Sequence, residues 1–125
     1  MEQATTILLV EDSPTQAKQL AADLESEMAH IIIADDGPAA LQMAYEHQPQ
    51  VIVLDINLPS MSGYQVCRRL KLDKDTTHIP VIMLTSADSS DNMMSGIEAG
   101  AEDYIPKDEF AVENLLNTLT AMGFI

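Results

Sequence analysis

The sequence predicts an α/β fold in which a parallel β-sheet is covered by helices on both faces. Two observations support this prediction: short apolar segments recur along the chain, and segments with helical spacing lie between them. The apolar segments are ILLV (7–10), IIIA (31–34), VIVL (51–54), VIML (81–84) and, more weakly, DYI (103–105). Continuous apolar segments suit strands that are buried on both faces, as the strands of parallel sheets are. Five strands that alternate with five helices imply right-handed crossovers and helices on each side of one sheet.

The first predicted helix has a well-marked start. Ser13 precedes Pro14, which suits a first helical position, and Gln16 completes a capping box. One apolar stripe follows at helical spacing, formed by Ala17, Leu20, Ala21, Leu24 and Met28. The pattern therefore predicts a helix directly after the first strand.

Glycine, proline and serine mark the ends of the other helices. The second helix follows Gly37 and stops before Pro49, and the third opens near Ser62. The fourth covers about 90–100 and stops at a glycine. The last helix ends at Gly123 and carries an apolar side made of Val112, Leu115, Leu116, Leu119 and Met122.

Length, composition and charge limit the classes of function. The 125 residues are 46% hydrophobic, which fits one domain, 1–125, with a single core. No apolar segment approaches the roughly 20 residues needed to cross a bilayer, and MEQATT at the N-terminus lacks the features of a secretory signal. We therefore expect a cytoplasmic protein. The formal charge of −14 argues against direct binding to nucleic acid or membranes and favours proteins, cations or both as partners.

Polar residues stand at the carboxyl ends of the predicted strands. Because these ends meet at one edge of a parallel sheet, their loops project into one crevice. We expect that crevice to contain Glu11, Asp12, Asp55, Thr85, Ser86 and Lys107. Three carboxylates in one crevice repel one another unless a cation compensates their charge, and oxygen ligands without His or Cys favour Mg²⁺ over zinc. Solvated loop charges are the alternative for Glu11 or Asp12 taken alone, but the combination with Asp55 and Lys107 favours a phosphate-handling site.

Four motifs occur in order at the ends of these elements. They are LLVEDS (8–13), VLDINLPSMSG (53–63), MLTSA (83–87) and GAEDYIPK (100–107). Together they resemble the receiver domain of bacterial response regulators, the CheY-like group, over essentially the whole chain. The resemblance implies a doubly wound (βα)5 flavodoxin-like three-layer sandwich with strand order 2-1-3-4-5.

The same resemblance implies the chemistry of the crevice. Asp55 would be the phospho-acceptor, attacking a phosphoryl group donated by a phosphohistidine of a sensor histidine kinase or phosphotransfer protein. Asp12 and Asp55 would ligate Mg²⁺ directly, with the backbone carbonyl of Asn57 as a third ligand and Glu11 acting through water. Such a domain catalyses only its own phosphorylation and dephosphorylation, so we expect a signalling switch rather than an enzyme.

The resemblance also implies a switch. Thr85 and Lys107 would hold the phosphoryl oxygens, and Tyr104 would turn inward as Thr85 moves toward them. The alternative for Tyr104 is a ring that simply packs in the core. The surface that signals to a downstream protein or fused output domain would be the fourth helix, fifth strand and fifth helix, including Met93, Met94, Ile97 and 109–122.

Two other functions compete with this interpretation. One is a receiver-like module that binds a protein through a fixed surface and never turns over phosphate; the complete set of acidic, hydroxyl and lysine positions argues against it. The other is a phosphatase or phosphotransferase with a strand-end aspartate, which would want a second carboxylate where this chain has Asn57. The cognate kinase, the stimulus, the oligomeric state and the presence of further domains stay open.

The chain departs from the family pattern after its lysine. The family usually has proline there, joined by a cis bond, whereas Lys107 precedes Asp108. Since a cis bond without proline costs about 2.5 to 4 kcal/mol, we predict a trans bond, with Asp108 capping the last helix. Ala87, two residues beyond Thr85, has a methyl group that cannot orient an attacking water, so we also expect a phosphorylated state that lasts longer than in relatives with an acid or amide at this position.

Overall fold

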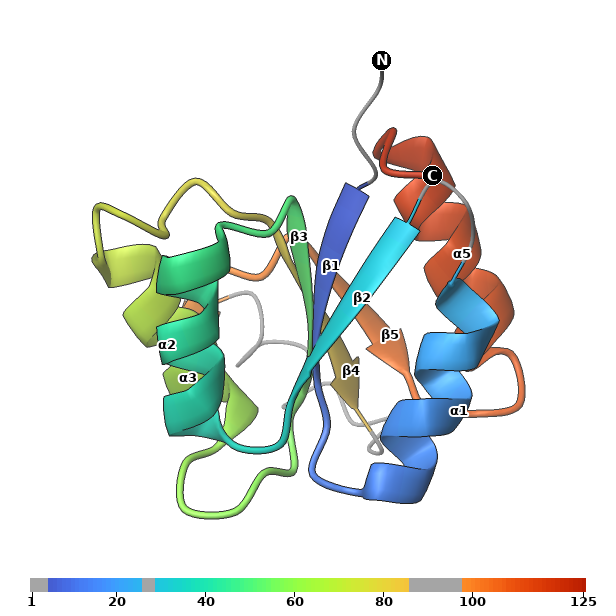
Figure 1. The fold of residues 1–125 in the computed structure, drawn as a ribbon, viewed down its shortest axis with the longest axis horizontal. Coiled ribbons are helices and arrows are strands. Elements are labelled where there is room, and N and C mark those ends of the chain that lie inside the picture. Colours follow the sequence, from blue (N-terminus) through green and yellow to red (C-terminus); the bar gives the residue numbers. More distant parts are fainter. Residues whose placement is uncertain (1–4, 26–28, 86–97) are drawn as a thin grey trace.

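The computed structural model describes residues 5–25, 29–85 and 98–125, which form one parallel sheet between two layers of helices (Figure 1). The strands are β1 (Thr5–Val10), β2 (Ala29–Ala34), β3 (Val51–Asp55), β4 (Val81–Thr85) and β5 (Asp103–Pro106). Their order in the sheet is β2-β1-β3-β4-β5, and every neighbouring pair is parallel. The predicted three-layer fold and strand order are confirmed.

The described helices lie on both faces of the sheet. They are α1 (Pro14–Leu24), α2 (Gly37–His47), α3 (Gly63–Leu72) and α5 (Ala111–Ala121). In Figure 1, α2 and α3 cover one face, and α1 and α5 cover the other. The fourth helix predicted over 90–100 falls mostly outside the described residues. No described helix has the length and apolarity to cross a membrane.

Each face of the sheet has its own core, because side chains alternate along the fully buried strands. In β3, Ile52 and Leu54 pack in the core under α2 and α3, whereas Val51 and Val53 pack in the core under α1 and α5. All four are completely buried. The alternation explains why β3 and β4 are apolar up to their last residues, Asp55 and Thr85.

The start of the first helix agrees with the prediction only in part. Ser13 caps α1, since its hydroxyl accepts a hydrogen bond from the Gln16 backbone N–H at 3.3 Å. The capping box predicted there is wrong, because the Gln16 side chain turns to the ammonium of Lys107, 3.3 Å away. A charged donor is a stronger partner than a backbone amide. The complete capping box is at α3, between Ser62 and Gln65.

The last helix begins later than the sequence suggests. The Lys107–Asp108 bond is trans, as predicted, because no cis bond occurs in the described chain. The cap assigned to Asp108 is wrong: Phe110 is the N-cap residue of α5 and provides no side-chain bond. Asp108 instead accepts a hydrogen bond from the Phe110 N–H at 2.8 Å, which stabilises the turn ahead of the helix.

Candidate functional site

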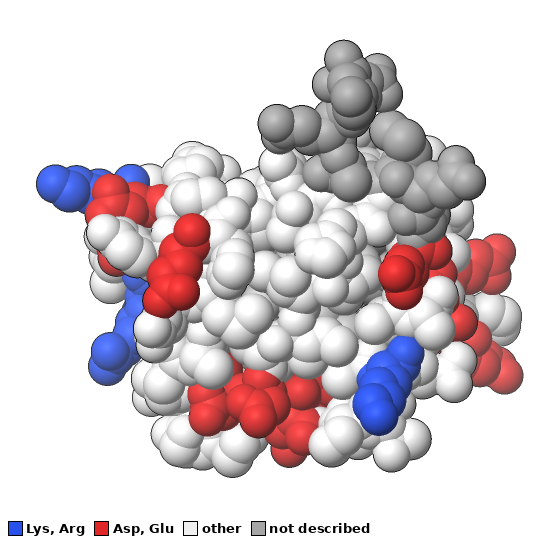
Figure 2. Space-filling model, in the orientation of Figure 1, with Lys and Arg blue, Asp and Glu red and all other residues white. Residues whose placement is uncertain are grey.

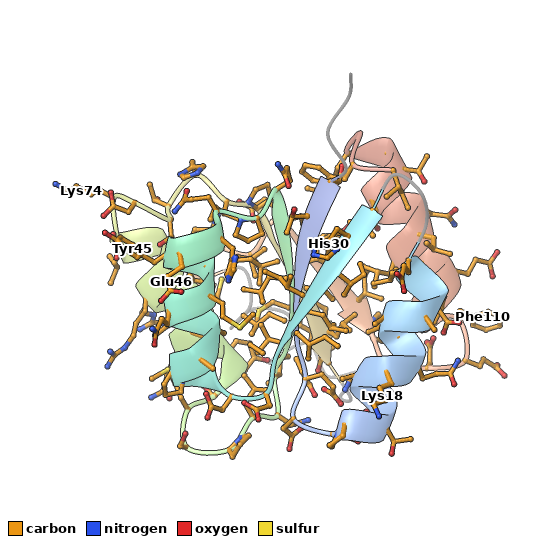
Figure 3. The ribbon with its side chains drawn as sticks, viewed as in Figure 1. Lys18, His30, Tyr45, Glu46, Lys74 and Phe110 are labelled. Carbon is orange, nitrogen blue, oxygen red and sulfur yellow. The ribbon has the colours of Figure 1, made fainter. Side chains whose placement is uncertain are left out.

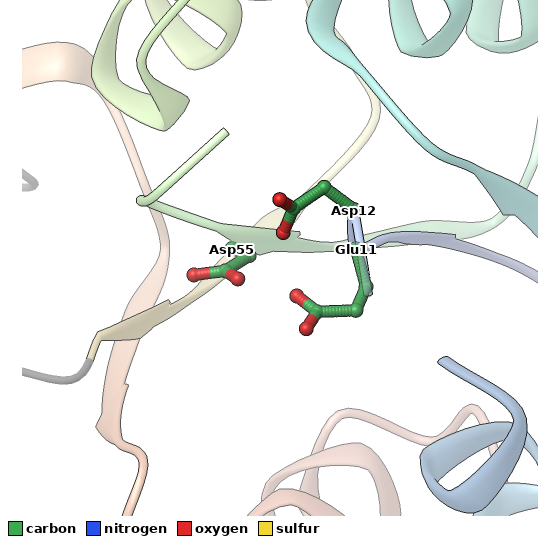
Figure 4. A group of neighbouring side chains, drawn as sticks. All are labelled: Glu11, Asp12 and Asp55. Carbon is green, nitrogen blue, oxygen red and sulfur yellow. The ribbon is translucent and has the colours of Figure 1, made fainter. Parts of the chain in front are cut away.

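Four of the five strands, β1, β3, β4 and β5, bring the predicted residues to one edge of the sheet. Glu11 and Asp12 follow β1 directly, Asp55 is the last residue of β3, and Thr85 is the last residue of β4. Lys107 follows β5 and donates its backbone N–H to the Thr85 carbonyl. Figure 2 shows a group of acidic side chains at the lower edge of the visible face, and Figure 4 shows Glu11, Asp12 and Asp55 converging.

The three carboxyl groups form one cluster. Glu11, Asp12 and Asp55 can each place an oxygen within 4.8 Å of the others. Glu11 and Asp55 are only 4% and 3% exposed, whereas Asp12 is exposed to solvent. Burial, followed by the hydrogen bond and the charge of Asp55, raises the pKa of Glu11 from 4.5 to about 7, although Lys107 opposes the rise. The negative charge of the cluster is therefore incompletely compensated by the protein.

Lys107 provides the positive charge at the centre of the site. Its Nζ atom lies 2.8 Å from Asp55 Oδ2 and 3.3 Å from Glu11 Oε2. It also donates to Gln16 Oε1 at 3.3 Å. Burial alone would lower the pKa of Lys107, but the hydrogen bond and charge of Asp55, and then those of Glu11, raise it. The ammonium stays protonated and occupies the space between two carboxylates.

Backbone groups hold Asp55 from the other side. Its Oδ1 atom accepts a hydrogen bond from the Asn57 N–H at 3.1 Å. The first residue of α3, Gly63, donates its N–H to the Ile56 carbonyl at 2.9 Å. A Cβ atom on Gly63 would lie 2.5 Å from the Asp55 carbonyl oxygen, so only glycine permits this approach of helix and strand. The backbone of Asp55 therefore packs directly against the first residue of α3.

Two residues, Gln16 and Gly63, contribute here in ways that the sequence did not predict. Gln16 was interpreted as a cap, and no local signal distinguishes a glutamine that turns toward a lysine 91 residues away. Gly63 was part of a quoted motif, but no role was assigned to it. The sequence does contain a signal for the role of Gly63. It directly follows the N-cap Ser62, and a glycine at a helix start permits another backbone segment to pack closely against it.

The structure describes some of the predicted switch and signalling residues but not all of them. Thr85 is buried at the end of β4, and Tyr104 lies in β5 with its hydroxyl oxygen enclosed by protein. Phe110, between β5 and α5, is 54% exposed and points away from the sheet (Figure 3). The remaining predicted residues, Ser86, Ala87, Met93, Met94 and Ile97, lie outside the described residues.

An apolar cavity of about 380 Å³ lies beside the site, between α1 and α5. Its lining includes the apolar residues Leu20, Leu84, Ala111, Val112 and Leu115. Polar and charged residues complete the lining: Glu11, Thr15, Gln16, Gln19, Asp23, Lys107 and Asp108. The charged groups of the site therefore stand at the border of a groove that is open to solvent.

The donor set fits a hard divalent cation. The described residues with metal-binding potential at one place are three carboxylates, with no imidazole or thiolate among them. Oxygen ligands of this kind suit Mg²⁺, which is held by one or two carboxylates and keeps several waters. Burial first, and then the hydrogen bond and charge of Asp55, raise the pKa of Glu11, so a cation here would compensate carboxylate charge that burial and Asp55 make unfavourable.

The comparisons with known proteins agree with this geometry. A family model described as "Response regulator receiver domain" matches residues 7–120. The chain belongs to this family. Receiver domains are signalling switches of two-component systems that interact with histidine kinases and output domains and bind Mg²⁺ in an acidic site.

Two curated relatives illustrate the family. Protein PilH of Pseudomonas aeruginosa is 37% identical over 118 residues, which cover 93% of this chain and 95% of PilH. Response regulator PleD of Caulobacter vibrioides is 42% identical over 101 residues, or 81% of this chain. That match spans only 22% of PleD, so this receiver corresponds to a small part of the longer protein.

Solved structures show the same fold. Chemotaxis protein CheY4 of Vibrio cholerae has a TM-score of 0.86 and 28% identity, covering 94% of this receiver and 98% of CheY4. The receiver domain of sensor histidine kinase PA1611 from Pseudomonas aeruginosa has a TM-score of 0.84 and 28% identity, covering 94% of this chain and 96% of that chain. That structure has a magnesium ion coordinated in its active site cleft.

Proposed function

We propose that this receiver accepts a phosphoryl group on Asp55 from a phosphohistidine of a sensor histidine kinase or phosphotransfer protein. The observation that carries the proposal is the surroundings of Asp55. It is a buried carboxylate at a strand end, with the Lys107 ammonium at 2.8 Å and two further carboxyl groups beside it. Phosphoryl transfer requires in-line positioning and neutralisation of oxygen charge, and this arrangement supports both.

In the proposed reaction, a carboxylate oxygen of Asp55 forms a bond to phosphorus while the donor's N–P bond breaks. The electron pair of that bond returns to the imidazole of the donor. The Asn57 N–H restrains Oδ1, and Lys107, now beside Oδ2, would move onto a phosphoryl oxygen. The Thr85 hydroxyl would donate to another. Each protein group thus stabilises charge that the transfer brings into the crevice.

The residues proposed to hold Mg²⁺ are Asp12, Asp55 and the backbone carbonyl of Asn57, with Glu11 acting through water. When bound, the ion would neutralise the acceptor carboxylate and the incoming phosphoryl oxygens. The acid cluster and the magnesium ion in the cleft of the related PA1611 receiver support this assignment. Glu11, with its raised pKa, would lose its proton more readily once a cation compensates its charge.

We propose that phosphorylation changes the conformation of the surface that a downstream partner recognises. Movement of Thr85 toward the phosphoryl group would draw Tyr104 inward and alter the surface of the fourth helix, β5 and α5, which a downstream protein or fused output domain would recognise. We place this function in a single domain, 1–125, in the cytoplasm. The alternative is a fixed binding module that uses the same surface without phosphoryl transfer.

Intact-mass spectrometry separates the two functions. The purified protein is incubated with Mg²⁺ and acetyl phosphate, and in parallel with a panel of phosphorylated histidine kinases. We expect one added phosphoryl group, which chelation of the metal abolishes and Asp55→Asn removes. Asp75→Asn is the matched control, because Asp75 is an exposed carboxylate in the turn after α3, before β4 begins, whereas the site lies where β4 ends. Incorporation that persists in Asp55→Asn, or none from any donor, would leave the fixed binding module.

A further inference from the structure

The ammonium of Lys107 has one neutral acceptor besides its two carboxylates. Its Nζ atom lies 2.8 Å from Asp55 Oδ2, 3.3 Å from Glu11 Oε2 and 3.3 Å from Gln16 Oε1. An ammonium group has three N–H donors, so these three residues together can satisfy all of them. The proposed function uses Asp55 to accept the phosphoryl group and Glu11 to act on the metal through water. Gln16 is therefore the acceptor that phosphoryl transfer leaves free to keep its contact with Lys107.

The start of α1 sets the position of Gln16. The Ser13 hydroxyl accepts a hydrogen bond from the Gln16 backbone N–H at 3.3 Å, and the Ser13 carbonyl accepts one from the Ala17 N–H at 2.8 Å. These bonds fix the first turn of α1 shortly after the end of β1. From this turn the Gln16 side chain reaches Lys107, 91 residues further along the chain. The contact thus links α1 to the segment between β5 and α5.

Gln16 and Asp55 contact the ammonium from different surroundings. Gln16 and Lys107 line the groove between α1 and α5, whereas Asp55 is not part of that lining. Asp55 is 3% exposed, and Gln16 is exposed to solvent. An ammonium that moves from Asp55 Oδ2 to a phosphoryl oxygen can therefore keep its bond to Gln16.

The absence of charge on Gln16 suits a crevice that has to accept a phosphoryl group. Three carboxyl groups, those of Glu11, Asp12 and Asp55, already lie together there. A further carboxylate in place of Gln16 would hold Lys107, but it would repel the phosphoryl oxygens and compete with them for the ammonium. An apolar side chain would add no charge, but it would leave one N–H donor to water. An amide oxygen holds the ammonium and avoids both effects.

We propose that Gln16 is a positioning residue for Lys107: its amide oxygen holds the ammonium beside Asp55 and keeps its contact as the ammonium moves to the phosphoryl group. The part that concerns phosphoryl transfer rests on the proposed function. The hold on Lys107 does not, because the contact is present in the protein without a phosphoryl group. The competing explanation is that Asp55 and Glu11 alone position Lys107, and that water serves equally well in place of Gln16.

Two substitutions separate the hydrogen bond of Gln16 from its lack of charge. Gln16→Met keeps the length and the helix propensity of the side chain but removes the acceptor, whereas Gln16→Glu keeps the acceptor and adds a charge. Gln19→Met is the matched control. Gln19 is an exposed glutamine of α1 that lines the same groove, and its side chain donates to Asp23 at 3.5 Å.

The first measurement is the exchange of the Lys107 ammonium hydrogens with water, followed by ¹H–¹⁵N spectroscopy of the full chain at one pH with a metal chelator. We expect Gln16→Met to speed this exchange about threefold to tenfold, because a hydrogen bond is lost, whereas Gln16→Glu and Gln19→Met do not speed it. Lys71 is an internal reference, since its ammonium is held by a backbone carbonyl at 2.7 Å and by Glu102 at 2.9 Å, at the opposite end of β5 from Lys107. Exchange of Lys107 at the wild-type rate in Gln16→Met would overturn the proposal. So would a wild-type Lys107 signal lost to fast exchange while that of Lys71 is visible.

The second measurement is the initial rate of phosphoryl gain from acetyl phosphate at saturating Mg²⁺, recorded by intact mass. We expect Gln16→Met to lower the rate about threefold to tenfold and Gln16→Glu to lower it at least as much, while Gln19→Met matches the wild type. A wild-type rate in Gln16→Glu would overturn the argument from charge, and a wild-type rate in Gln16→Met would overturn the role of Gln16 in transfer. No phosphoryl gain by the wild type from any donor would count against the proposed function, and the exchange of Lys107 would still decide whether Gln16 positions it.

Discussion

Replacing Glu11 by glutamine tests how closely the acidic groups are packed. In the folded protein without added metal, burial and then Asp55 raise the pKa of Glu11 from 4.5 to about 7. The folded state therefore binds this proton more tightly than the unfolded chain does. The stabilisation from Glu11 is fully present below pH 4.5 and is lost as the pH rises through about 7. Glutamine resembles the protonated side chain at every pH, so the variant should not show this loss.

The size of the effect follows from the shift. Because the pKa of Glu11 changes from 4.5 to about 7, the folded protein loses up to about 3 kcal/mol of stability as the pH rises through this range. Lys107 does not interfere, because its raised pKa affects stability only above its ordinary value of 10.5. The wild type should lose this stability between pH 4.5 and pH 8, whereas Glu11→Gln should not. The difference in the free energy of unfolding between the variant and the wild type should therefore grow by up to about 3 kcal/mol over this pH range.

Urea denaturation with a metal chelator, followed by circular dichroism at several pH values, measures this difference. Glu113→Gln is the control, since Glu113 is exposed on α5 and should give a curve parallel to that of the wild type. Added Mg²⁺ should reduce the difference at pH 8, because a cation compensates the charge of Glu11. Parallel curves for Glu11→Gln and wild type would show that Glu11 is not held against Asp55 as described.

Three further changes have defined outcomes. Gly63→Ala should lower the free energy of unfolding by about 1 to 3 kcal/mol in urea denaturation, because its Cβ would meet the Asp55 carbonyl oxygen at 2.5 Å; unchanged stability would contradict the close packing. Ser60→Gly should raise the free energy of unfolding by up to about 1 kcal/mol, because Ser60 has φ of +62°; a loss measured in the same assay would show that its side chain matters more than its backbone. Asp12→Ala should weaken Mg²⁺ binding about tenfold or more in calorimetry, and an unchanged affinity would remove Asp12 from the ligands.

The fold could be predicted from the sequence because each of its signals is local. A strand buried on both faces is apolar almost throughout, and α1, α2 and α3 each start after a residue, such as Ser62, whose side chain accepts from a backbone amide of the first turn. Parallel order then brings every strand end to one edge. For this reason Asp55 and Lys107, 52 residues apart, could be assigned to one crevice before any contact was known.

Side-chain partners could not be predicted in the same way, because they depend on what the fold brings near. Gln16 had a plausible local partner at the N-cap, but the charged Lys107 offers a stronger one across the crevice. Asp108 stabilises a turn instead of capping α5, because the chain makes that turn before the helix begins at Ala111. A local rule compares only the partners that lie nearby in sequence.

The amino-acid sequence by itself determined the order of elements, the edge at which the site forms and the residue types that meet there. Only the tertiary structure decided how those groups affect one another. The raised pKa of Glu11 arises first from burial and then from Asp55, a group distant in sequence. Desolvation and short-range polar interactions depend on distances of a few ångströms, and those distances exist only once the two cores have packed against the sheet.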